Sequence, residues 1–149
     1  MNEIKFYRVN DPYGCFSNFA PYGFKIDGIY WRTVEHYFQA QKFEDIVLQE
    51  KIRNTISPME VALMGRDRSN PLRKDWDKIK DNIMKKAVLE KFKQNDEIKK
   101  ILLHTKDRKI IEHTSNDFYW ADGGDGSGKN KLGIILMEVR DSLLYLLKR

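Results

Sequence analysis

Residues 24–43, FKIDGIYWRTVEHYFQAQKF, join a β-hairpin pattern to a helix pattern. Asp27 and Gly28 separate two short apolar runs, and this dipeptide tolerates the positive φ angles of a type I′ turn. After the second run comes Thr33, a favourable helix N-cap residue, and apolar residues then recur at helical spacing. The stretch therefore predicts a small antiparallel sheet and a helix that can continue through residues 46–53.

Outside this stretch the chain shows helical periodicity over most of its length. Ser57, Pro58 and Glu60 fit a capping box with proline at the first helical position. Apolar residues also recur at helical spacing in the segment that follows Trp76 and in the segment that follows Leu132. We expect strands over residues 3–9 and 109–114, and helices over 58–66, 76–92 and 98–102 and from 132 onward. The fold class is α+β, mostly helical, with a small antiparallel sheet.

Composition predicts one globular domain over residues 1–149. The chain is 41% hydrophobic and 33% charged, and it has only 4 Pro and 9 Gly, so no linker is visible. The single cysteine, Cys15, excludes an intramolecular disulfide and a zinc site with several thiolates, and it favours a cytoplasmic location. Residues 1–15 lack the apolar run of a secretory signal, and no apolar span is long enough to cross a membrane. We therefore expect no membrane association.

The net charge of +5 is modest and unevenly distributed. Residues 73–109 carry 13 basic and 7 acidic side chains, so this segment holds the whole excess. We interpret it as a solvated helix face, with a polyanion-binding stripe as the alternative. A nucleic-acid-binding protein that uses this stripe is a weaker hypothesis, because acidic residues interleave and no readout motif is present.

A glycine-rich segment precedes the last predicted helix. Its glycines are Gly123, Gly124, Gly126 and Gly128. Glycine lets a ligand approach the backbone, and free N–H groups at a helix start attract anions, so the segment predicts either a phosphate cradle or a flexible loop. It nearly matches a Walker A motif, but Asn130 follows Lys129 where Ser or Thr would bind magnesium, and no buried strand precedes it. A nucleotide triphosphatase is therefore not expected.

Glu35, Gln39 and Lys42 are spaced to line one face of the first predicted helix. Such a face could bind a sugar or a heterocycle, and the alternative is an exposed polar stripe. Trp76 and Trp120 lie beside acidic residues, where a tryptophan can stack on a flat ring or belong to the core. The three histidines are not spaced as metal ligands, so no metal site is expected.

Several ordered segments match the motifs of one protein family. They are GCFSNF at 14–19, YWRTVEHYFQAQKF at 30–43, RKDW at 73–76, DFYW at 117–120, GGDGSGKNKLG at 123–133 and LMEVR at 136–140. On these segments the chain resembles the NADAR family over nearly its whole length. It departs from the family at Ala121, where the family often has Gly, and this change affects the loop shape more than the chemistry.

The resemblance implies an N-glycosidase that acts on phosphorylated ribosyl compounds with water and needs no cofactor. For one branch of the family it implies early riboflavin-pathway substrates, the ribosylaminopyrimidine and ribosylaminouracil 5-phosphates, which release ribose 5-phosphate and the base. For other members it implies removal of ADP-ribose from guanine bases of nucleic acid. A pocket that binds ADP-ribose without cleaving it is the alternative from another class. The sequence leaves the oligomeric state open.

Cleavage of a ribosyl C–N bond passes through an oxocarbenium-like state, which a nearby carboxylate stabilises. Glu35 is the first candidate, and Asp117, which matches a family motif, is the second. The sequence does not show which is acid, base or cation stabiliser. Trp76 matches a family site position and is expected to stack on the base. Further substrate contacts are expected from Ser17, Asn18, Phe19, Arg32, Gln39, Lys42, Trp120, Gly126, Gly128 and Asn130, with the glycine loop and Asn130 at the phosphate.

Overall fold

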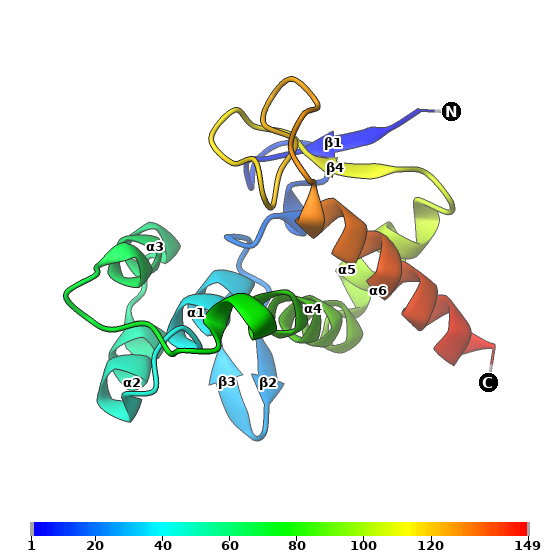
Figure 1. The fold of residues 1–149 in the computed structure, drawn as a ribbon. Helices are drawn as coiled ribbons and strands as arrows, with labels where there is room; N and C mark the ends of the chain where they lie inside the picture. Colours follow the sequence, from blue (N-terminus) through cyan, green and yellow to red (C-terminus); the bar gives the residue numbers. More distant parts are fainter. Residues whose placement is uncertain (1, 149) are drawn as a thin grey trace.

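The computed structural model describes residues 2–148 as six α-helices, a short 3-10 helix and four strands (Figure 1). In chain order the elements are β1 (Ile4–Phe6), η1 (Gly14–Phe16), β2 (Phe24–Ile26), β3 (Ile29–Trp31), α1 (Val34–Ala40), α2 (Ile46–Asn54), α3 (Pro58–Arg66), α4 (Trp76–Gln94), α5 (Asp96–His104), β4 (Ile110–Glu112) and α6 (Lys131–Leu147). This order confirms the α+β class with helices in the majority.

The antiparallel hairpin is formed as predicted, with Phe24 opposite Trp31. Asp27 and Gly28 have φ angles of 53° and 79°, which a type I′ turn requires. β1 does not join this hairpin but pairs in parallel with β4, with Ile4 opposite Ile110. The local pattern predicted both of these strands but could not show that they pair, because their partners lie about 100 residues apart.

The first helix is shorter than its apolar spacing predicts. The Thr33 side chain caps it by accepting a hydrogen bond from the backbone N–H of His36 at 3.1 Å. It ends at Ala40, and the expected continuation through 46–53 is a separate helix, α2. Asp45 sets the start of α2, since its side chain caps that helix by accepting from Val47 N at 2.9 Å. The continuous helix is therefore a wrong prediction.

The remaining predicted elements are confirmed, with small changes at their ends. Ser57 caps α3 by accepting from Glu60 N at 3.3 Å, with Pro58 at the first helical position. Helices α4, α5 and α6 begin within two residues of the predicted positions. Within the described residues, no helix is both long and apolar enough to span a bilayer.

The core brings two groups of elements together. In Figure 1, α1, α2, α3 and the hairpin lie on one side of the molecule, and the β1–β4 pair with the loop before α6 lies on the other. Helix α4 contacts both α1 and α6. Buried side chains of α4, among them Met84, Val88 and Phe92, belong to the same core as Phe16 and Leu132. The candidate site lies where α1, α4 and that loop meet.

Candidate active site

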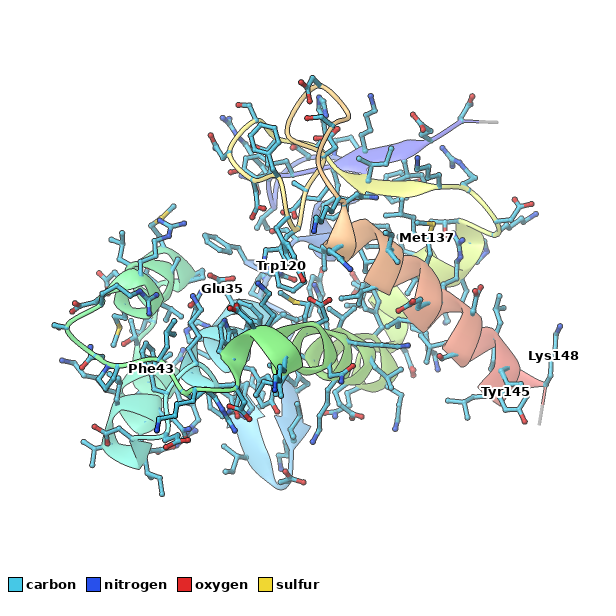
Figure 2. All side chains as sticks on the ribbon, viewed as in Figure 1. Glu35, Phe43, Trp120, Met137, Tyr145 and Lys148 are labelled. Carbon is cyan, nitrogen blue, oxygen red and sulfur yellow. The ribbon has the colours of Figure 1, made fainter. Side chains whose placement is uncertain are left out.

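Glu35 lies in the first turn of α1 and is buried, with 8% of its surface exposed. Figure 2 shows Glu35 and Trp120 in the central part of the molecule. Gln39 donates a hydrogen bond from Nε2 to Glu35 Oε2 at 2.8 Å, one helical turn away, as the spacing predicts. Burial raises the pKa of Glu35, and this hydrogen bond and the charges of Lys42 and Arg66 oppose the rise. Glu35 is thus a carboxyl group with its own donor and nearby cations.

The face formed by Glu35, Gln39 and Lys42 is not an exposed polar stripe. Gln39 is 7% exposed, and its Oε1 is buried with no hydrogen-bond partner in the part of the chain that the structure describes. Burial lowers the pKa of Lys42 to about 8, and its Nζ lies 3.5 Å from the carbonyl oxygen of Gly65. Buried polar groups normally have partners, so an unpaired amide oxygen beside a carboxyl group suits a ligand.

Gly65 leaves room for the Gln39 side chain, because a Cβ atom at residue 65 would lie 1.8 Å from Gln39 Oε1. Replacing Gly65 by alanine should therefore displace the Gln39 side chain from Glu35. We expect kcat/KM to fall about tenfold, the loss of one oriented hydrogen bond to a charged group. Stability should also fall, because a buried hydrogen bond is lost, and the higher helix propensity of alanine offsets only part of that loss. Leu63→Ala on the exposed side of α3 is the control, and unchanged kinetics in Gly65→Ala would show that Gln39 does not orient Glu35.

An aromatic cluster begins one turn after Glu35. The Phe38 ring contacts Trp76 at 5.0 Å and Trp120 at 5.4 Å between ring centroids, both in edge-on geometry. Trp120 also packs edge-on against Tyr119 at 4.8 Å. Trp76 is buried, whereas Trp120 is half-buried. The structure thus brings the two predicted stacking residues together, and their cluster adjoins Glu35.

Asp117 lies close enough to Glu35 for its charge to raise the pKa of Glu35. Its Oδ1 accepts hydrogen bonds from the backbone N–H groups of Tyr119 at 2.9 Å and Trp120 at 2.8 Å. These two bonds form the turn that places Trp120 against Phe38. The second predicted carboxylate is therefore near the first, but one of its oxygens holds the backbone.

Sequence reasoning missed a further carboxyl group, that of Glu112 at the end of β4. Burial and the charges of Asp117, Glu35 and Asp122 raise its pKa to about 8. Glu112 belongs to no motif in the sequence. The only available signal was an acidic residue at the end of the predicted strand 109–114, and such a residue is usually solvated.

The loop before α6 is not the expected cradle of free amides. Four of its glycine N–H groups already donate within the loop, to Asp117 O, Asp122 Oδ1 and, in two cases, Asp122 O. The first amides of α6, from Lys131 and Leu132, donate to carbonyl groups of Tyr119 and Trp120. Gly126 has nothing within 4 Å of the position of a Cβ atom. A Cβ atom at residue 128 would lie 2.4 Å from the carbonyl oxygen of Ala121, so Gly128 packs closely against the backbone of its own loop.

The Asn130 side chain, predicted to contact the phosphate, forms hydrogen bonds with the backbone of β4. Its Nδ2 donates to Ile110 O at 2.9 Å, and its Oδ1 accepts from Glu112 N at 3.0 Å. The side chain is buried and its φ is 51°. Both ends of the amide are therefore occupied by the backbone of β4, which Asn130 holds against the start of α6.

Lysine side chains gather where the loop passes α4. The Nζ atoms of Lys80, Lys129 and Lys131 lie 4.2, 5.5 and 5.8 Å from the centroid of the Tyr119 ring. The Tyr119 hydroxyl donates to Asp81 at 2.5 Å. We call Lys80, Lys129 and Lys131 the lysine cluster. It adjoins Trp120 through Tyr119, and Lys80 is close enough to Lys42 to lower its pKa.

The other predicted residues differ in how close they come to Glu35. Asn18 is adjacent, because its carbonyl oxygen accepts from Glu35 N at 3.1 Å and its Oδ1 is buried without a partner among residues 2–148. Ser17 Oγ accepts from Phe19 N at 3.1 Å, which fixes the turn beside Asn18. Arg32 is exposed, and its charge acts on His36 rather than on Glu35. The structure thus leaves Arg32 outside this group.

Comparison with known proteins identifies the family of the chain. The model of the NADAR domain matches residues 5–144. The chain belongs to the NADAR family. This NADAR chain is 55% identical over 140 residues to N-glycosidase YbiA of Escherichia coli (strain K12), covering 94% of this chain and 88% of that protein. The resemblance inferred from the sequence motifs is confirmed.

Two further comparisons bear on the fold and on the relatives of this NADAR chain. The NMR structure of the E. coli protein YbiA matches it with a TM-score of 0.91 and 53% identity, covering 98% of this chain and 87% of that one. The chain is also 41% identical over 140 residues to riboflavin biosynthesis protein VVA0006 of Vibrio vulnificus (strain YJ016), covering 94% of this chain and 38% of that longer protein. The expected NADAR fold is confirmed.

Proposed function

We propose that this NADAR protein hydrolyses the N-glycosidic bond of a phosphorylated ribosyl compound and releases ribose 5-phosphate and the base. The enzyme class, a hydrolase of N-glycosyl compounds, follows from 55% identity to an N-glycosidase along 94% of the chain. Ribosylaminopyrimidine and ribosylaminouracil 5-phosphates are the proposed substrates. The name of the Vibrio relative, a riboflavin biosynthesis protein, supports this choice.

The observation that carries the proposal is the buried Glu35 carboxyl group, which has Gln39 as donor and Phe38 one turn further along α1. As the bond between ribose C1 and the base nitrogen breaks, its electron pair goes to nitrogen and positive charge develops on the ribose. A carboxylate in a site with little water stabilises that charge strongly. The aromatic cluster offers ring faces and edges for a flat base, and water completes the reaction at C1.

The lysine cluster is the proposed binding site for the phosphate, in place of the loop amides. Exchanging Lys80, Lys129 and Lys131 together for glutamine should raise KM for the phosphorylated substrate about 30-fold and change kcat little, since the phosphate does not react. Steady-state kinetics with the substrate and with its dephosphorylated nucleoside would measure this. Lys93→Gln, which removes a lysine paired with Glu90 on the same helix, is the control. An equal loss on both substrates would contradict the assignment.

Chromatographic detection of ribose 5-phosphate and free base tests the proposed function directly. Wild-type protein should release both from the ribosylaminopyrimidine and ribosylaminouracil 5-phosphates. A guanine-ADP-ribosylated oligonucleotide and free ADP-ribose serve as the comparison substrates. Binding of ADP-ribose with no cleavage of any substrate would overturn the proposal in favour of a binding module.

A second candidate function is removal of ADP-ribose from guanine bases of nucleic acid. It is favoured by more cationic side chains than one phosphate needs, since Arg66, Arg68 and Lys80 are all close enough to lower the pKa of Lys42. A diphosphate could contact several of these side chains. Cleavage of the modified oligonucleotide alone would establish this function instead.

A further inference from the structure

Glu112 is held in place from both sides of its peptide backbone. Its N–H donates to Asn130 Oδ1 at 3.0 Å, and its carbonyl oxygen accepts from Asp122 N at 2.9 Å. It pairs with Phe6 of β1 in the parallel sheet. These contacts fix the backbone of Glu112 and leave its carboxyl group free for a role at the site.

The carboxyl group of Glu112 forms no hydrogen bond or ion pair with any residue between 2 and 148. Its three electrostatic neighbours, Asp117, Glu35 and Asp122, are also carboxyl groups. Glu112 is half-buried, and an unpaired carboxyl group among like charges has a cost in stability that a function would explain.

The other three acids each have a donor. Glu35 accepts from Gln39, and Asp117 accepts from two backbone N–H groups. Asp122 lies 2.7 Å from the ring of His113, and it also accepts from the N–H groups of Thr114 and Gly124. Donors and cations stabilise the ionised form of an acid, whereas burial among like charges favours the neutral form. Burial raises the pKa of both Glu35 and Glu112, but Gln39, Lys42 and Arg66 oppose the rise at Glu35, and no donor or cation of the described residues opposes it at Glu112.

We infer that Glu112 is the general acid that protonates the departing base. The inference rests on the proposed function. As the C1–N bond breaks, its electron pair goes to the base nitrogen, which takes the proton from the Glu112 carboxyl group. Water then bonds to C1, and the proton that it loses returns to Glu112. Glu35, with its donor and nearby cations, stabilises the cationic ribose. Pairs of acids with opposed environments divide acid and carboxylate roles in this way.

The kcat/KM of Glu112→Gln, measured with two kinds of leaving group, tests this role. One leaving group needs a proton and the other does not. We expect Glu112→Gln to lower kcat/KM about 100-fold on the ribosylaminopyrimidine substrate, the usual contribution of a general acid. Nicotinamide mononucleotide releases a neutral base without a proton, so its cleavage should stay within about threefold of wild type. Glu138→Gln, which changes an exposed acid paired with Lys85, is the control. An equal loss on both substrates, or no loss on either, would overturn the inference.

The pH profile is a second readout. Because Glu112 acts in its protonated form, wild-type kcat/KM should fall as the pH rises through about 8, the pKa of Glu112. The residual activity of Glu112→Gln should lack this fall. The same alkaline fall in both proteins would assign it to another group, such as Lys42, and would count against Glu112.

An NMR titration separates failure of the inference from failure of the proposed function. The side-chain carboxyl carbon of Glu112, assigned by its disappearance in Glu112→Gln, should titrate well above the usual value of about 4.3. A midpoint near that value overturns the inference whether or not the protein is active. Wild-type protein that releases no base from any substrate would instead remove the proposed function. The titration would still show whether Glu112 holds its proton.

Discussion

Replacing Glu35 by glutamine should lower kcat about 10³-fold and leave the Kd for ribose 5-phosphate within about threefold of wild type. Glutamine keeps the shape of the side chain and can still accept a hydrogen bond from Gln39. It carries no negative charge, so the cationic ribose loses its main stabilisation while the ground-state product does not. Single-turnover release of base, followed by chromatography, measures the first quantity, and calorimetry measures the second.

The Glu35 substitution should not act by unfolding the protein. Burial raises the pKa of Glu35 in the folded state above its unfolded value. An acid shifted in this direction makes the protein less stable as the pH rises through the interval between the two pKa values. Glutamine removes that loss, so Tm at pH 8 should equal or exceed that of wild type. Glu44→Gln, at an exposed position just beyond Lys42, is the matched control, and turnover within twofold of wild type in Glu35→Gln would exclude a catalytic role.

Local interactions account for most of what the sequence could predict of the fold. The positive φ angles at Asp27 and Gly28 and the caps at Thr33 and Ser57 depend on residues within three or four positions. The start of α2 is also set locally, because Asp45 caps that helix. Helical spacing alone gave no reason to expect an end at Ala40, since a cap can override periodicity.

The candidate site was predictable where its parts share an element or a motif. The contact between Gln39 and Glu35 follows from i, i+4 spacing on α1, and the motif match drew attention to Trp76, Asp117 and Trp120. The approach of Glu112 depends instead on a parallel strand pairing between distant segments and on a loop folded back over β4. Neither leaves a local pattern, so the residue on which the further inference rests could be found only in three dimensions.

The glycine loop is a second feature that the local sequence could not decide. Glycines ahead of a helix are compatible with a phosphate cradle and also with a loop that binds its own backbone. Which one forms depends on where the carbonyl groups of residues 117–122 lie. In this structure they lie within reach of the loop amides and accept their hydrogen bonds, which is why we propose the lysine cluster as the phosphate site instead.

Asn130→Ala should lower the free energy of unfolding by about 3 kcal/mol. The substitution removes two buried hydrogen bonds, each worth about 1 kcal/mol, and leaves alanine at a φ of 51°, which costs about 1 kcal/mol more. The urea midpoint measures the loss. Asn82→Ala at an exposed position of α4 is the control, and it should change stability by less than about 0.5 kcal/mol.

Asn130→Gly separates the two contributions, because glycine tolerates the left-handed conformation but lacks the amide. We expect it to be destabilised by about 2 kcal/mol, the hydrogen bonds alone. If Asn130 serves the backbone of β4 and not the phosphate, folded Asn130→Gly should bind ribose 5-phosphate as tightly as wild type. A variant of undiminished stability with weakened phosphate binding would restore the ligand role that the sequence suggested. Since Asn130 Oδ1 also accepts from Glu112 N, the alkaline fall in kcat/KM should change in Asn130→Gly even where phosphate affinity does not.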